Sequence, residues 1–204
     1  MHLDILTENQ VELLDTVRRF KRTHYLVGGT AIALHLGHRR SVDFDLFTIS
    51  KLNKNRIKSM LKNLPFKQTV LFEDYDQVHF LVNQVKLTFF SYPYAVKHPI
   101  MADRWMSMPT LLSLAAMKAF ALGRRAKWKD YVDLFFILRE RHALADICVE
   151  AESIFGEQFS AKLFREQLAF HKDIDHTEPV EYVGPSVDDE TVKNYLIDKS
   201  TEIF

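Results

Sequence analysis

The sequence from His24 to Phe47 reads HYLVGGTAIALHLGHRRSVDFDLF, and this stretch decides the fold. In order, it predicts a strand, a glycine turn, a short helix, a basic corner and a second strand. Three of the six glycines in the chain lie in it, at Gly28, Gly29 and Gly37. A glycine pair between a strand and a helix lets the backbone approach a ligand closely. Because the first N–H groups of a helix have no partner within the helix and the helix dipole favours anions there, this turn suits a phosphate.

The second strand carries two aspartates, Asp43 and Asp45. Side chains alternate along a strand, so both aspartates point to one face with Cα atoms roughly 6.5 Å apart, while Val42, Phe44 and Leu46 point into a core. Two carboxylates spaced in this way can share Mg²⁺ with substrate phosphates. A Gly-Gly step is more often only a turn, and Asp-x-Asp is more often a solvated strand face. Together and in this order, the two signals indicate phosphoryl transfer.

Two segments, GGTA at residues 28–31 and HRRSVDFDLF at residues 38–47, resemble the nucleotidyltransferase AbiEii/AbiGii toxin family of the polymerase-β-like nucleotidyltransferase superfamily. The resemblance implies that a nucleoside triphosphate is the substrate and that Mg²⁺ is held by catalytic Asp43 and Asp45. The nucleotide-binding residues that it implies in this unit are Gly28, Gly29, Thr30, Arg39 and Ser41.

Composition is that of an ordinary globular protein, with 204 residues, 47% hydrophobic and 26% charged. The formal net charge is zero, so a global basic surface for nucleic acid is absent, although local basic patches remain compatible with it. The single cysteine, Cys148, excludes a disulfide framework. No apolar run reaches the length of a membrane span and no signal peptide is recognisable, so a soluble, cytoplasmic protein without a membrane partner is expected.

Hydrophobic periodicity divides the chain near residue 100. Before it, helices are expected at residues 7–21, 30–36 and 53–64, and strands at 24–27, 42–48, 67–72, 78–82 and 85–92. This order predicts an α+β core over residues 1–100, with the mixed sheet of the nucleotidyltransferase fold and flanking helices. The helix over 53–64 has a basic face, which is either simply solvated or in contact with a phosphate backbone.

After this boundary, residues 101–204 are expected to form a mostly helical region that completes the active-site cleft. Helices are expected at residues 109–122, 128–141, 143–155, 161–170 and 188–199. Prolines predict a loop around Trp105, and residues 171–185 are charged and contain proline, so they predict a loop that closes over a neighbouring part of the chain.

Lys118 lies within the apolar stripe of the helix over 109–122, so it must be buried and paired or must extend to a polar site. The segment AAMK at residues 115–118, with GRRAKWKDYVDL at 123–134, resembles the second conserved block of the family. This resemblance implies that catalytic Lys118 also binds nucleotide and that Asp133, and less so Asp130, belongs to the active site. Asp133 is expected to pair with Lys118 or Arg124, and a purely structural ion pair is the competing interpretation.

One feature departs from the superfamily pattern. Polymerase-β-like enzymes generally use a third carboxylate from a neighbouring strand, but the strand over 85–92 has Thr88 at that position. Another base could then serve, from the group Glu73, Asp74 and Asp76, or transfer could be slow or lost.

Two functions follow. The resemblance implies the toxin of a toxin–antitoxin or phage-defence system, a Mg²⁺-dependent nucleotidyltransferase that moves a nucleotide onto RNA, plausibly tRNA, and that has a cognate antitoxin as partner. The alternative is a nucleotidyltransferase fold that binds nucleotide or a partner without transfer; Thr88 favours it, and the intact Asp-x-Asp motif argues against it.

Overall fold

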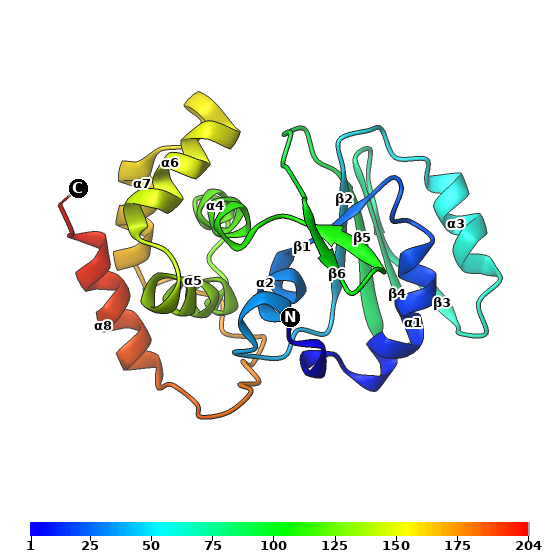
Figure 1. Cartoon of the computed structure of the whole chain (residues 1–204), viewed down its shortest axis with the longest axis horizontal. Coiled ribbons are helices and arrows are strands. Elements are labelled where there is room, and N and C mark those ends of the chain that lie inside the picture. Colours follow the sequence, from blue (N-terminus) through cyan, green and yellow to red (C-terminus); the bar gives the residue numbers. More distant parts are fainter. Residues whose placement is uncertain (204) are drawn as a thin grey trace.

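The computed structural model describes residues 1–203, and its centre is the five-stranded mixed sheet that the sequence predicts (Figure 1). The strand order is β1-β2-β5-β4-β3, and only the β2–β5 pair is parallel. The strands are β1 (Tyr25–Val27), β2 (Phe44–Thr48), β3 (Gln68–Glu73), β4 (Gln77–Val82) and β5 (Val85–Ser91). The expected hairpin between β4 and β5 is confirmed, because Asn83 and Gln84 both have positive φ, as a two-residue turn of this kind requires.

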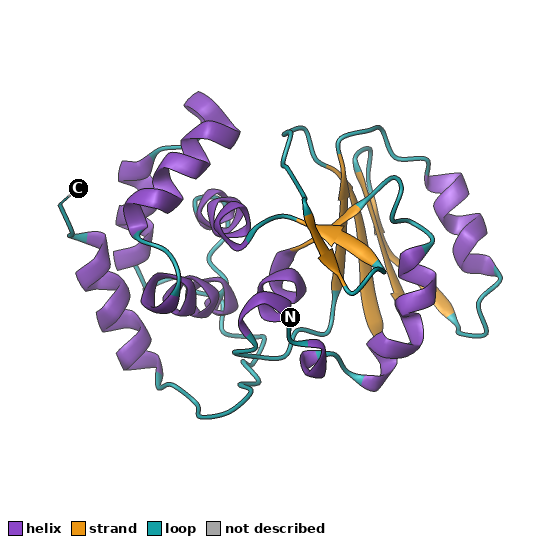
Figure 2. Cartoon of the chain, in the orientation of Figure 1, coloured by secondary structure: helices purple, strands orange, loops and turns teal. Residues whose placement is uncertain are grey.

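Helices cover both faces of this sheet. Helices α1 (Glu8–Arg18) and α3 (Lys54–Lys62) lie on one side and α2 (Gly28–Leu36) on the other (Figure 2). The expected cap Thr7 begins α1, because its hydroxyl accepts a hydrogen bond from the Gln10 N–H while the Gln10 side chain accepts one from the Thr7 N–H. The short helix η1 (Leu3–Ile5) precedes α1.

The second half of the chain is helical, as the sequence predicts. Helix α2 packs against both α4 and α5, so it connects the sheet with the helical half. The helices of this half are α4 (Leu111–Leu122), α5 (Trp128–Glu140), α6 (Leu144–Phe155), η2 (Gly156–Gln158), α7 (Ala161–Ala169) and α8 (Asp189–Ser200). Among residues 1–203, no helix is long and apolar enough to cross a membrane.

The structure differs from the expected loop around Trp105. Strands β6 (Ile100–Ala102) and β7 (Met106–Met108) form a hairpin that packs beside β1, and Asp103 and Arg104 in its turn have positive φ. Three-residue strands between prolines carry too little alternation for a strand to be recognised from sequence. The first helix of the second half begins at Leu111, so the hairpin at the predicted boundary accompanies the sheet.

Residues 171–185 contain no helix or strand, as expected, and they bridge two distant segments. On one side, the Trp128 N–H donates to the Asp175 carbonyl oxygen over 3.0 Å. On the other, the Arg40 N–H donates to the Glu181 carbonyl oxygen over 2.8 Å. The loop therefore spans the start of α5 and the basic corner that precedes β2.

Candidate active site

The glycine turn and Asp45 touch one another. Strand β1 pairs with β2 so that Val27 lies opposite Asp45, and α2 begins immediately afterwards at Gly28, whose φ is +74°. A Cβ atom on Gly28 would overlap Oδ2 of Asp45, and one on Gly29 would lie 2.7 Å from a terminal nitrogen of Arg39. The Gly-Gly motif is therefore needed for two close approaches, that of a carboxylate and that of a guanidinium.

We expect Gly28→Ala to remove activity and to destabilise the fold. The left-handed backbone alone costs a residue with a Cβ about 1–2 kcal/mol, and the Asp45 carboxylate must also move. Thermal unfolding and a nucleotide-transfer assay measure the two effects. Gly184→Ala is the matched control, because Gly184 has φ +93° but no neighbour within 4 Å of a Cβ. We expect the control to keep its activity. If Gly28→Ala also kept full activity, the close approach of Gly28 to Asp45 would not be required for function.

Thr30 fixes the chain before β2. Its buried hydroxyl donates to the Asp43 carbonyl oxygen and lies 3.0 Å from Oγ of Ser41. Gln10 donates from Nε2 to the Ser41 carbonyl oxygen over 2.8 Å. The Thr30 side chain is therefore occupied inside the protein. Of the predicted nucleotide-binding residues in this unit, Gly29, Arg39 and Ser41 line a cleft, whereas Gly28 and Thr30 do not.

Asp43 and Asp45 line one cleft of about 470 Å³, as their spacing predicts. Asp43 lies just before β2, and its Oδ2 is 3.0 Å from Nζ of Lys86, a cation on β5 that sequence reasoning did not single out. Burial and the charge of Asp43 raise the pKa of Asp45, and Lys86 opposes this rise. Asp43 and Asp45 lie on the same wall of the cleft and repel one another, so a further cation between them is favoured.

The carboxylate pair fits a divalent cation that completes its coordination elsewhere. Within residues 1–203, no cluster of three or more acidic, histidine or cysteine side chains is arranged to hold a metal. Mg²⁺ commonly binds one or two carboxylates and takes its remaining ligands from substrate phosphates and water. The pair therefore matches a metal that arrives with a nucleotide rather than one held by a closed protein cage.

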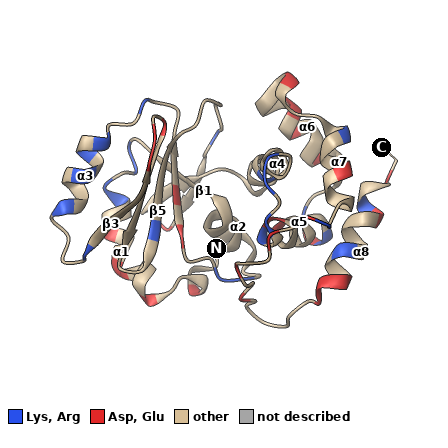
Figure 3. Ribbon diagram, turned by 180° about the vertical axis from the view of Figure 1, so that it is seen from behind, with Lys and Arg blue, Asp and Glu red and all other residues tan. Residues whose placement is uncertain are grey.

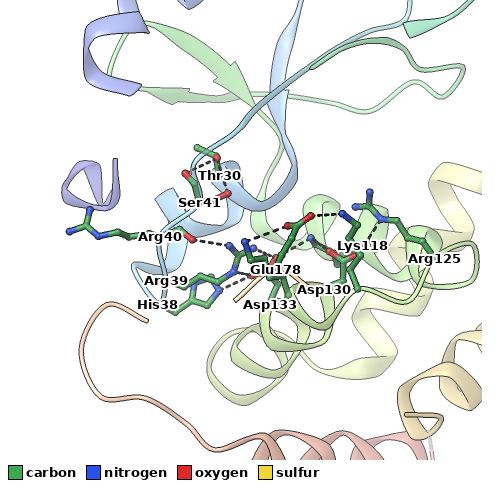
Figure 4. A network of polar contacts seen from close by, with 12 residues as sticks. Thr30, His38, Arg39, Arg40, Ser41, Lys118, Arg125, Asp130, Asp133 and Glu178 are labelled. Atoms are coloured by element: carbon green, nitrogen blue, oxygen red, sulfur yellow. Dashed lines mark hydrogen bonds and ion pairs between the residues drawn. The ribbon is translucent and has the colours of Figure 1, made fainter. Parts of the chain in front are cut away.

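Behind the cleft, Asp133 is the centre of a buried polar network (Figure 4). Arg39 donates from Nε to Oδ1 over 2.7 Å and from its terminal nitrogen to Oδ2 over 2.8 Å. His38 donates from Nε2 to Oδ1 over 2.8 Å, and Nζ of Lys118 lies 3.0 Å from Oδ2. Burial alone would raise the pKa of Asp133, but the charges of Arg39 and Lys118 and these hydrogen bonds hold it well below its usual value.

This geometry changes the role predicted for Asp133. Its side chain is 0% exposed and both oxygens are occupied, so it cannot touch a substrate and instead positions the cations around it. The expected pairing with Lys118 is confirmed, but the proposed partner Arg124 is wrong, because that guanidinium lies over the ring of Phe120 at 4.2 Å.

Lys118 is buried and paired, the first of the two outcomes that its position in the stripe allowed. Its Nζ lies 2.6 Å from Oδ1 of Asp130, whose Oδ2 accepts from Nε of Arg125 over 3.2 Å. Burial would lower the pKa of Lys118, but Asp130 and Asp133 raise it above its usual value, so the ammonium stays charged. Lys118 and Arg39 both line the cleft, where their charges are balanced by Asp130 and Asp133, so they provide ordered hydrogen-bond donors rather than net positive charge.

Further cations reach the cleft from the turn before α5 and from its first turn. Arg125, Lys127 and Lys129 line it, and Lys127 donates to Oε1 of Glu178 over 2.6 Å while Lys129 lies 3.4 Å from Oε2. Glu178 belongs to the loop over 171–185, so this loop places a carboxylate against two cations of the site. The cleft therefore has the Asp43–Asp45 pair with Lys86 on its sheet side, and on the other side a majority of cations interleaved with Asp130, Glu178 and Glu181.

Thr88 lies directly opposite Asp45 in the parallel β2–β5 pair. The position expected to carry a third carboxylate, in the row of residues that runs across the strands from Asp45, therefore has a hydroxyl group. The substitute bases predicted for it are wrong: Glu73 is ion-paired with Lys58 of α3, and neither it, Asp74 nor Asp76 lines the cleft.

The next residue on that row is His79 of β4, which sequence reasoning missed. Burial and Lys86 lower the pKa of His79, whereas Asp45 and Asp43 act to raise it. The alternation of His79 with buried Val78 and Phe80 was the available signal.

Comparison with known proteins places this geometry in a family. The family model of the nucleotidyl transferase AbiEii toxin of type IV toxin–antitoxin systems matches residues 12–191. An uncharacterised protein of Aquifex aeolicus is 33% identical over 120 residues, which cover 57% of this chain and 58% of that relative, so the match spans less than two thirds of its length.

Two solved structures share the fold. The nucleotidyltransferase toxin MenT4 of Mycobacterium tuberculosis superposes with a TM-score of 0.66 at 13% identity, over 95% of this chain and 82% of that one. JHP933 of Helicobacter pylori superposes with a TM-score of 0.55 at 17% identity, over 96% and 91%. With the family match over most of its length, the chain belongs to the nucleotidyl transferase AbiEii toxins of type IV toxin–antitoxin systems.

Proposed function

We propose that this protein transfers a nucleotide from a nucleoside triphosphate to an RNA acceptor, as the toxin of a toxin–antitoxin pair. The observation that carries the proposal is the cleft in which Asp43 and Asp45 face Lys118, Arg125 and their neighbours. Such a cleft can hold a polyphosphate between a metal-binding pair and fixed cations. The RNA acceptor, proposed to be tRNA, and the cognate antitoxin are inferred from the family.

Several residues of the cleft have separate roles in the proposed phosphoryl transfer. At the start of α2, Gly29 lines the cleft, and the N–H groups of this first turn would bind phosphate oxygens there. Asp43 and Asp45 would hold Mg²⁺, which would supply neutralisation of phosphate charge. The acceptor hydroxyl attacks the α-phosphorus, its proton leaves to a base, and the bond to pyrophosphate breaks. Arg125, whose side chain is half exposed at the cleft, is placed to stabilise charge on the leaving group.

Strand β5 provides no carboxylate as a base, because Thr88 lies opposite Asp45 and the strand contains no acidic residue. His79 lies next to Thr88 in the ladder, but it does not line the cleft, so by the same criterion as Glu73 it is not in a position to take the proton directly. The alternative function, nucleotide binding without transfer, rests on the same threonine. The two functions are distinguished by whether a labelled nucleotide is transferred from the triphosphate to an acceptor.

The loop over 171–185 provides a prediction about binding strength. Glu178→Gln removes the carboxylate that now occupies Lys127 and Lys129, so both cations become available to phosphates. Because half-exposed ion pairs are worth up to about 1 kcal/mol, we expect nucleoside triphosphate to bind about threefold to fivefold more tightly. Isothermal titration with a non-hydrolysable analogue measures this change. Asp173→Asn, an exposed residue of the same loop, is the control, and equal affinity in all three proteins would contradict the prediction.

The proposed function is tested with each labelled nucleoside triphosphate, Mg²⁺ and total cellular RNA. We expect label to move into RNA with the intact protein, and to stay in the triphosphate with Asp43→Asn or when the metal is chelated. Binding without transfer in the intact protein would instead favour the alternative function. Absence of both binding and transfer would refute the two together.

A further inference from the structure

A second cavity of about 510 Å³ lies at the other end of β2. It is formed by the turn after α1, the segment that follows β2, the first turns of α3 and residues 94–98. None of its lining residues lines the active-site cleft. A strand rises about 3.3 Å per residue, so Thr48 at this end is about 16 Å from Asp43. The two sites are therefore separate but lie along one strand.

The interior of this cavity is apolar and aromatic, with two buried polar atoms that lack a partner in the described part of the chain. The lining includes Phe20, Leu52 and Tyr94. The unpartnered atoms are Nε2 of His24 and the hydroxyl of Tyr25, and both residues line the cavity and are more than nine-tenths buried. Both atoms are shielded from solvent, and an unsatisfied buried polar group costs about 1–3 kcal/mol, so a small movement of these side chains toward a ligand that supplies the missing hydrogen bonds is favoured.

The form of His24 follows from its neighbours. The hydroxyl of Thr23 donates to the Phe20 carbonyl oxygen over 3.2 Å, so it accepts from Nδ1 of His24, which lies 2.9 Å away. The proton is then on Nδ1, and Nε2 is a bare acceptor. Burial lowers the pKa of His24 to about 4, which agrees with a neutral ring at pH 7. A ligand that meets this nitrogen must donate a hydrogen bond, as the amino group of a nucleobase does.

The rim of the cavity is strongly basic. Six of its lining residues are Lys or Arg and none is Asp or Glu, although the whole chain carries no net charge. Within residues 1–203, none of the exposed rim cations Arg22, Arg56 and Lys97 forms an ion pair. Helix α3 has Lys and Arg along its length and no acidic residue (Figure 3). An anion is thus attracted to the mouth of an apolar cavity.

We propose that this second cavity binds a nucleotide unit, with its base in the interior and its phosphate on the basic rim. An acidic peptide would use the rim alone and would leave the aromatic interior and the acceptor nitrogen of His24 unused. The ligand is either a free nucleotide or one nucleotide of a single-stranded RNA, because aromatic surfaces and cations recognise both. The proposal goes beyond the transferase function and does not depend on it.

Equilibrium binding of AMP and of a fluorescent oligoadenylate tests the proposal, with a chelator present to exclude metal-dependent binding in the active-site cleft. Three variants of the full chain are compared. Arg22→Glu with Arg56→Glu reverses two rim charges, and Ser50→Trp fills the cavity without a change in charge. Lys62→Glu with Lys67→Glu is the charge-matched control, because both lysines are exposed and lie outside the cavity. Thermal unfolding shows that each variant is folded.

We expect both the rim variant and Ser50→Trp to lose at least about tenfold in affinity, and the control to stay close to the unmodified protein. If both variants bind AMP and the oligoadenylate more weakly, the cavity is a free-nucleotide site. If they bind only the oligoadenylate more weakly, the cavity is a site for a nucleotide of a single strand. Unchanged binding in Ser50→Trp would overturn the proposal, because the interior would not be in use. Equal loss in the control would also overturn it, because general charge would then explain the binding.

Discussion

Asp43→Asn combined with Asp45→Asn is expected to reduce nucleotide transfer by at least about 10³-fold while the protein stays folded. Among residues 1–203, these two carboxylates form the only acidic pair that lines the cleft from the sheet, and under the proposed function a metal held there would supply several kcal/mol of charge stabilisation to phosphoryl transfer. Asparagine keeps the volume of each side chain, so packing around β2 is preserved. Single-turnover transfer of labelled nucleotide measures the effect.

A second readout separates this catalytic role from a structural one. The pKa of Asp45 is raised by burial and by Asp43, so its ionised form costs stability at neutral pH. Asp45→Asn removes that cost, and we expect the free energy of unfolding at pH 7 to rise by about 0.5–2 kcal/mol, the range found when such a site is relieved. The gain should shrink as the pH falls below the pKa of the folded state and should vanish below about pH 4, where Asp45 is neutral in the folded and the unfolded state. A double variant that transfers nucleotide at the normal rate would refute the metal role.

The sequence predicts those parts of the site that are local. The glycine turn, the two aspartates and their common face follow from turn chemistry and from the two-residue period of a strand. Most helices follow from the apolar periodicity, and α1 also from its Thr7 cap. These features depend on residues within about ten positions of one another, where spacing alone fixes geometry.

The remainder depends on contacts between distant segments. Arg39 and Asp133 are 94 positions apart, and no spacing rule pairs them. From the sequence alone, Arg39 is therefore predicted to bind phosphate, and its contact with a buried carboxylate is missed. Glu178 could not be foreseen for the same reason, because its position depends on the backbone contacts of the loop with Trp128 and Arg40. The row that joins Asp45, Thr88 and His79 requires the strand order, which connects β2 with β5 and not with β3.

Asp133→Asn is expected to destabilise the protein by about 3–5 kcal/mol at pH 7, far more than the loss of an exposed carboxylate. The substitution leaves Arg39 and Lys118 buried with one negative charge fewer, and no water can replace it because Asp133 is 0% exposed. Asp15→Asn on the exposed face of α1 is the control, with an expected change within about 0.5 kcal/mol. Denaturant unfolding measures both values.

The pH dependence identifies the carboxylate as the cause. Because the pKa of Asp133 in the folded state lies well below its usual value, the stability that it contributes is complete above the usual range of aspartate and is lost as the pH falls toward the folded pKa. The difference in unfolding free energy between the unmodified protein and Asp133→Asn should therefore narrow below about pH 4. A difference that stayed constant with pH would indicate that packing, and not charge, makes Asp133 essential. Combined replacement by Asp133→Leu, Arg39→Met, Lys118→Met and Asp130→Asn should restore much of the stability but no activity, since neutral side chains can replace a buried ion network but cannot attract a polyphosphate.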